Sequence, residues 1–259
     1  SGMIIDAHLH ITENDEKNNI LACIEEGNIL GLVAGTNPED CHRIHELAQR
    51  CNLIIPTYGL HPWYADKASL KDMEPYLTAC PIIGEIGLDS VWCDVDLNDQ
   101  RKVFIAQLDL AEERGCPVIL HTKGQEKEIA RIIADYTVPV IVHWYSSENF
   151  LDKYLERDCY FTVGPDVHIN PAVQQVVREV PLDRLFVESD GISAVEWATG
   201  TAITPRELPS ILSASMNFIA EAKNVDPETV RTQMKKNLAR LLKGSDDAII
   251  FTKSVVLSE

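Results

Sequence analysis

Two histidines near the start of the chain, His8 and His10, stand two residues apart in the apolar segment MIIDAHLHI (3–11). Side chains alternate between the two faces of an extended strand, so both imidazoles point the same way. Neutral imidazoles are common ligands of zinc and related divalent ions. An isolated His-x-His pair at a strand end also occurs without any metal. Ligand-type residues at the ends of other strands therefore decide between the two interpretations.

Such residues recur where later apolar segments end. Glu85 interrupts the apolar run PIIGEIGLD, where a bare charge is costly to bury. The segments CPVILHTK, VPVIVHWYS and LFVESDG end in or near His121, His143 and Asp190. His61, in GLHPW, follows another strand-like segment. This repetition is hard to explain by packing and indicates a shared site.

The elements that must position these side chains follow a regular alternation. Eight strand-like runs alternate with amphipathic helical segments, and two further helices are predicted over about 205–223 and 227–242. Apolar strands separated by helices predict a parallel sheet covered by helices. Eight repeats favour an α/β fold closed into a (β/α)8 TIM barrel with extra C-terminal helices. The alternative, an open doubly wound sheet, lacks its GxGxxG signal here.

Length and composition narrow the class of protein. A chain of 259 residues fits one barrel, so 1–259 is predicted to be a single domain, with residues 1–2 as a remnant of cloning. No apolar run approaches the roughly 18 residues of a membrane span, and no leader is recognised, so no membrane contact is expected. Seven scattered cysteines without a CxxC pair predict reduced thiols and a cytoplasmic location. The apolar tail 247–259 is expected to dock against the rest of the protein.

The formal net charge of −17 disfavours a broad basic surface for nucleic acid. Bound metal ions can nevertheless supply positive charge locally, so a phosphate-containing substrate stays open. In a TIM barrel the carboxyl ends of the strands form one face, where active sites lie. This face is predicted to gather six ligand-type side chains, namely His8, His10, Glu85, His121, His143 and Asp190.

Six ligands exceed the need of one tetrahedral zinc and suit two divalent ions that share a bridge. The N-terminal histidine pair and Asp190 are expected to bind one ion, and His121 and His143 the other. Glu85 is the expected bridge, because a carboxylate can offer one oxygen to each ion. A metal-held water would lose a proton near neutral pH and act as the nucleophile, with Asp190 as the group that takes and returns a proton. Nitrogen-rich ligation favours Zn²⁺, with Mg²⁺ or Mn²⁺ as alternatives.

The order and spacing of these motifs resemble the TatD-like metal-dependent hydrolases of the amidohydrolase superfamily. The resemblance runs through nearly the whole chain, in DAHLH, GLHPW, IGEIGLD, PVILHTK, IVHWYSS, VESD and NLARLL. It implies a TIM barrel with a dinuclear site that hydrolyses phosphodiester bonds, commonly those of DNA. By motif match, the six side chains above fall on the metal ligands of the family, and His61 falls on its substrate-contacting histidine.

The substrate-facing loops depart from the family's usual pattern. Ser90 and Val91 replace a frequent tyrosine pair, and Lys123 replaces an arginine. Beyond VESD, the segment ATGTAITPRELP replaces the loop that is usual in the family. DNA and a small phosphoester therefore both stay open as substrates, with Lys123 as a candidate phosphate contact. The four tryptophans fall near the predicted rim, where they could stack on a ring or pack the loops (Trp63, Trp92, Trp144 and Trp197).

Two other functions are considered. An amidohydrolase acting on an amide or lactone of a small substrate would use nearly the same ligands. Glu85 stands where such enzymes can carry a lysine available for carbamylation, which favours the TatD-like hydrolase interpretation. A non-catalytic metal-binding module is the second alternative, and a closed site filled by protein ligands would support it.

Overall fold

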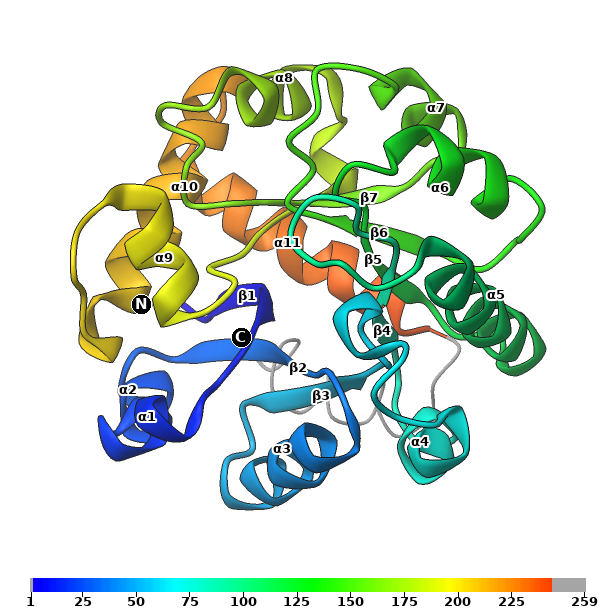
Figure 1. Cartoon of the computed structure of the whole chain (residues 1–259). Helices are drawn as coiled ribbons and strands as arrows, with labels where there is room; N and C mark the ends of the chain where they lie inside the picture. The colour runs from blue at the N-terminus through cyan, green and yellow to red at the C-terminus, as the bar shows by residue number, and fades with distance from the viewer. Residues whose placement is uncertain (1, 244–259) are drawn as a thin grey trace.

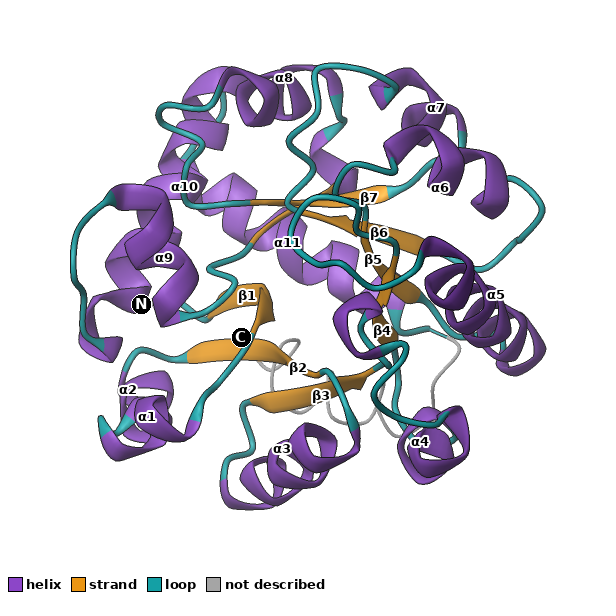
Figure 2. Ribbon diagram, in the orientation of Figure 1, coloured by secondary structure: helices purple, strands orange, loops and turns teal. Residues whose placement is uncertain are grey.

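The computed structural model describes residues 2–243, and the sheet at its centre contains eight parallel strands in sequential order. Figures 1 and 2 show these strands in the middle of the molecule with helices around them. The strands are β1 (Ile4–Leu9), β2 (Ile29–Gly35), β3 (Ile54–Tyr58), β4 (Ile83–Gly87), β5 (Val118–His121), β6 (Val140–His143), β7 (Tyr160–Val163) and β8 (Leu185–Val187). This arrangement confirms the predicted TIM barrel.

The helices surround the barrel (Figure 2), and along the chain α1 to α8 lie between successive strands while α9 to α11 follow β8. They are α1 (Glu13–Lys17), α2 (Ile20–Glu26), α3 (Pro38–Arg50), α4 (Leu70–Leu77), α5 (Leu97–Arg114), α6 (Glu126–Ile133), α7 (Leu151–Glu156), α8 (Pro171–Glu179), α9 (Ile192–Thr199), α10 (Leu208–Lys223) and α11 (Pro227–Leu241). Short 3₁₀ turns occupy 62–64, 182–184 and 205–207.

The strands form as predicted because they are rich in β-branched and apolar residues and are buried on both faces. Clear caps set the helix ends. At α3, the Asn37 side chain accepts a hydrogen bond from Asp40 N and Pro38 occupies the first turn. At α5, Asp96 caps the start and Gly115 ends the helix in the left-handed conformation. These local signals fix where α3 and α5 begin and where α5 ends.

The barrel is completed between its first and last strands. The backbone N–H of Asp190, just after β8, donates to the carbonyl of His8 in β1 at 2.9 Å. Helices α10 and α11, the two extra C-terminal helices, pack against β1 and β8. The buried Asn237 of α11 donates to the carbonyls of Leu182 and Leu185 and so anchors this helix beside β8. The C-terminal helices therefore support the strand pair that carries part of the site.

The connections after β1 and β8 contain more helices than a simple alternation of strands and helices would give. After β1 there are two short helices, α1 and α2, because Asn19 adopts a left-handed conformation between them. The segment after β8, predicted as a loop before the C-terminal helices, contains α9. The tail 247–259, predicted to dock, lies outside the described residues.

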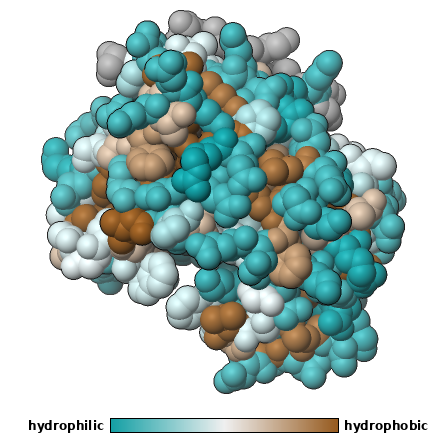
Figure 3. Space-filling model, turned by 90° about the horizontal axis from the view of Figure 1, so that it is seen from above, coloured by the Kyte–Doolittle hydropathy of each residue, from teal (hydrophilic) through white to brown (hydrophobic). Residues whose placement is uncertain are grey.

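The surface and the thiols follow the composition. The face seen in Figure 3 is mainly hydrophilic with separate apolar patches. All seven cysteines are free, and all but Cys93 are buried. Among residues 2–243, no helix has both the length and the apolar character that a membrane span requires.

Candidate metal centre

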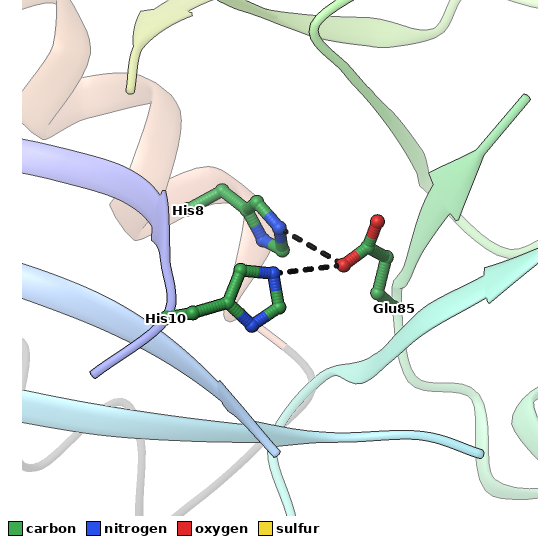
Figure 4. A group of neighbouring side chains, drawn as sticks. All are labelled: His8, His10 and Glu85. Carbon is green, nitrogen blue, oxygen red and sulfur yellow. Dashed lines mark hydrogen bonds and ion pairs between the residues drawn. The ribbon is translucent and has the colours of Figure 1, made fainter. Parts of the chain in front are cut away.

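Glu85, in β4, lies at the centre of the site and is almost fully buried. Its Oε2 atom lies 3.2 Å from Nε2 of both His8 and His10, at the end of β1 (Figure 4). Its Oε1 atom lies 2.9 Å from Nδ1 of His121 and 3.1 Å from Nε2 of His143. The two carboxylate oxygens therefore face two different pairs of histidines.

Asp190 completes the part of the site next to β1. Its Oδ1 atom lies 3.4 Å from Nε2 of both His8 and His10. This oxygen is buried and has no hydrogen-bond partner among the described residues. We call His8, His10 and Asp190 the β1 group, and His121 and His143 the β5–β6 group. The structure thus brings together all six side chains predicted as ligands. His143 also lies beside His8 and Asp190, since one donor atom of each of these three residues lies within 4.8 Å of the others.

Two further buried carboxylates hold the rings of the β5–β6 group. His121 Nε2 lies 2.7 Å from Asp89 Oδ2, and His143 Nδ1 lies 3.0 Å from Glu188 Oε1. An ionised carboxylate can only accept, so each ring donates one N–H to that partner. The other nitrogen of each ring faces Glu85 and would offer its lone pair to a metal ion that displaces a proton there. Hydrogen bonds of this kind orient histidines that bind metals.

Asp89 and Glu188 are also fixed by other donors. The indole N–H of Trp63 donates to Asp89 at 2.7 Å, and the Thr162 hydroxyl donates to Glu188. Neither Asp89 nor Glu188 is among the site residues predicted from the sequence. The available signal was an acidic residue at the end of an apolar strand, which must find a partner when it is buried. That signal does not identify the partner.

His61 faces the same Glu85 oxygen as the β5–β6 group, with its Nε2 atom 3.3 Å from Oε1. Its Nδ1 atom accepts a hydrogen bond from the backbone N–H of Trp63 at 3.1 Å. Burial lowers the pKa of His61 to about 4, so the ring is neutral near pH 7. A neutral ring that accepts at Nδ1 carries its proton on Nε2. This tautomer suits hydrogen-bond donation to a substrate better than metal ligation.

The electrostatics of the site favour bound positive charge. Burial alone would raise the pKa of Glu85, but the surrounding histidines hold it well below its usual range. Burial alone would lower the pKa of His10, yet its hydrogen bond to Glu85 and the charge of Asp190 raise it to about 9. Glu188, Glu85 and Asp190 likewise raise the pKa of His143, against the effect of burial. The cluster therefore attracts cations, and metal ions compete with these protons.

The spacing of the donor atoms fits metal ions. Two ligand atoms about 2.1 Å from one zinc ion at the tetrahedral angle lie roughly 3.4 Å apart. The Nε2 atoms of His8 and His10 lie 3.2 Å from Glu85 Oε2 and 3.4 Å from Asp190 Oδ1. Asp190 Oδ1 is a buried acceptor with no hydrogen-bond partner among the described residues, and a cation would satisfy it. Histidine and carboxylate donors are also the ligand types that zinc accepts.

Lys123 is placed at the rim of the barrel. It is half-buried, and its amino group lies 5.8 Å from the centre of the Trp92 ring. The predicted gathering of the tryptophans at the rim is also observed, since Trp197 contacts both Trp92 and Trp144. The structure thus separates a buried ligand cluster from a rim that carries aromatic rings and a cation.

A closed parallel barrel with histidines and carboxylates at the carboxyl ends of its strands defines a metal-dependent hydrolase of the TIM-barrel class. The model of the TatD related DNase family matches residues 5–243, and the chain belongs to this family. The enzyme is thus a hydrolase that depends on metal ions.

The relatives agree with this assignment. Deoxyribonuclease TATDN3 of Homo sapiens is 24% identical, over 92% of this chain and 94% of its own length. The uncharacterized metal-dependent hydrolase YabD of Bacillus subtilis is 25% identical, over 93% of this chain and 99% of its own. The crystal structure of the TatD homologue YjjV from Escherichia coli superposes with a TM-score of 0.80 at 21% identity, covering 92% of this chain and 97% of that one. At 21% identity, the match to the YjjV structure shows a shared fold.

Proposed function

We propose that the protein hydrolyses phosphodiester bonds, with DNA as the substrate class, by means of two divalent ions. The observation that carries this proposal is the position of Glu85, whose two oxygens face the β1 group and the β5–β6 group separately. A carboxylate in this position would be able to hold two ions, and paired ions suit phosphodiester hydrolysis. The family, and the name of the human relative, support DNA as the substrate.

The roles of the residues follow from their placement. His8, His10 and Asp190 would hold one ion, His121 and His143 the other, and Glu85 would join them. When bound, the two ions supply Lewis acidity and a water of lowered pKa. Asp190, whose pKa burial raises, would take a proton at a carboxylate oxygen and return it to the leaving group.

Two residues are proposed to bind the substrate. His61 would donate the Nε2 proton to an oxygen of the phosphate, because its Nδ1 atom is already occupied by the Trp63 N–H. Lys123 would place a positive charge at the rim, where the phosphate backbone enters. In a protein with a net charge of −17, such local cations must offset the repulsion of a polyanion.

Zn²⁺ is the proposed resident metal, since four of the six donors are imidazoles, with Mg²⁺ and Mn²⁺ as alternatives. We further propose that residues 1–259 act as one catalytic domain in the cytoplasm. The free state of all seven cysteines supports a reducing compartment.

The test combines metal analysis with a substrate panel. Protein freed of metal by a chelator is reloaded with each of the three metals and assayed on DNA, a phosphodiester, a phosphomonoester and an amide. We expect about two ions per chain and turnover of phosphodiesters only after reloading. Turnover of amides without turnover of phosphoesters would replace this proposal by the amidohydrolase alternative. Metal binding without turnover of any substrate would favour the non-catalytic one.

A further inference from the structure

The exposed apolar side chains of the described residues gather at one end of the barrel. Six large apolar side chains are exposed, and each lies in the stretch that follows the carboxyl end of a strand (Trp63, Val91, Trp92, Phe150, Ile169 and Trp197). Scattered exposed apolar residues need no explanation, but a concentration around a site indicates a binding surface. The mouth of this barrel is therefore a candidate binding surface for an apolar or aromatic group.

Three tryptophans form a continuous row on this rim. The ring of Trp197, in α9, lies 6.0 Å from that of Trp92 with the planes at 89°, and 6.2 Å from that of Trp144 with the planes at 71°. Trp197 is 67% exposed and Trp92 is 53% exposed. Two nearly perpendicular rings make a corner, in which a flat ligand can contact one ring by its face and the other by its edge.

The row is joined to the candidate metal centre at both ends. The backbone N–H of Trp92 donates to Asp89 Oδ1 at 2.7 Å, and the other oxygen of Asp89 lies 2.7 Å from His121. Trp144 directly follows His143 in the chain. The carboxylate of Asp89 thus positions both His121, a candidate metal ligand, and the backbone of Trp92 at one end of the row.

Trp144 is held in place by its neighbours. Its indole N–H donates to Asp166 at 2.8 Å, and its ring lies over Gly164, where any Cβ would come within 2.5 Å of it. A ring fixed in this way loses little conformational freedom when a ligand binds. Lys123, with its amino group near the Trp92 ring, adds positive charge on the same side.

We propose that Trp92, Trp144 and Trp197 form a stacking subsite for an unpaired nucleobase next to the phosphate that is cleaved. This proposal rests on the proposed function and specifies how its substrate is held. A base offers a flat π-face to the exposed rings, and the phosphate attached to it is complementary to Lys123. A base inside a duplex is stacked on its neighbours and has no free face, so the subsite selects unpaired bases.

The test compares a short oligothymidylate with an oligomer of the same length built from abasic units. In the wild-type protein we expect kcat/KM to favour the base-bearing oligomer by about tenfold or more. Trp197→Ala should lower this preference about tenfold, and Trp197→Phe should retain most of it. Tyr136→Ala is the control, since it removes a half-buried ring from the α6–β6 connection, at the opposite end of the barrel.

Binding of the same two fluorescently labelled oligomers is measured by anisotropy in the presence of a chelator, so that it does not depend on hydrolysis. A preference for the base-bearing oligomer that Trp197→Ala abolishes supports the subsite, even if no substrate is cleaved and the proposed function fails. Equal binding of both oligomers by the wild-type protein, or a preference that Trp197→Ala leaves unchanged, would overturn the subsite. Phosphodiester cleavage without that preference would leave the proposed function standing alone.

Discussion

The β1 group and the β5–β6 group contribute the same kind of ligand but are built differently. In the β5–β6 group each histidine is bound to a buried carboxylate through its second nitrogen, and its side chain is only 9 to 11% exposed. In the β1 group the side chain of His10 is 31% exposed and that of Asp190 is 20% exposed. His8 Nδ1 has no hydrogen-bond partner among residues 2–243.

If the cluster binds two ions as proposed, this difference predicts that the two ions are bound with different strength. Carboxylates behind metal-binding histidines fix the tautomer and raise the basicity of the ligand. The β5–β6 group is therefore organised before a metal arrives, whereas His10 and Asp190 of the β1 group are partly exposed to solvent. We expect the ion of the β1 group to exchange more readily, on the side where substrate and water must enter.

The largest expected effect belongs to the residue that both groups share. Glu85→Ala should lower turnover by at least about a thousandfold, because it removes a ligand from both ions at once. Metal analysis should show loss of both ions, while circular dichroism retains the barrel signal. Loss of one ion only would assign Glu85 to one group and contradict the proposal that both groups share it.

His61→Ala tests where the β5–β6 group ends. His61 faces the same Glu85 oxygen as this group but carries its proton on Nε2, so it should not be a ligand. We expect turnover to fall about a hundredfold through loss of a hydrogen bond to the substrate, with the metal content unchanged. A variant that binds one ion fewer would make His61 a third member of the group.

Asp89→Asn tests the carboxylate behind His121. An amide can donate as well as accept, so the preferred tautomer of the ring is lost, and the affinity for one ion should fall about 10- to 100-fold. Asp6→Asn is the matched control. Asp6 is an equally buried aspartate whose carboxylate accepts from Ser189 and from the backbone of His8, with no hydrogen bond to a ring. Metal titration followed by calorimetry should separate the two variants, and equal losses would contradict the comparison.

The smallest expected effect is the dependence of stability on pH that His10 of the β1 group produces. In metal-free protein the pKa of His10 is raised to about 9, so the folded state keeps a proton that the unfolded chain has lost above its ordinary pKa. The stabilisation is fully present below about pH 6.5 and is lost as the pH rises through 9. Between pH 7 and 9 the melting temperature should therefore fall by a few degrees, and less in metal-loaded protein, where the ion replaces the proton. Parallel curves with and without metal would argue against metal binding at His10.

The sequence predicted the barrel because each strand carries its own signal. Segments such as PVILH and VPVIVH are apolar on both faces, and caps such as Asn37 and Gly115 are local. The same local reasoning failed where the signal was short. Helix α9 spans eight residues beside a loop rich in glycine and threonine, and it is held by burial of Ile192 and Val195. That burial depends on neighbours distant in the chain.

Sequence alone determined which residue types stand at the ends of the strands, since the alternation of faces and the rule that parallel strands end on one face need no coordinates. Only the tertiary structure decided which oxygen of Glu85 meets which histidine, and that Asp89 and Glu188 hold two of the rings. These contacts join residues separated by 32 and 45 positions. A hydrogen bond depends on distances of a few tenths of an ångström, and those are set by how the strands pack rather than by their composition.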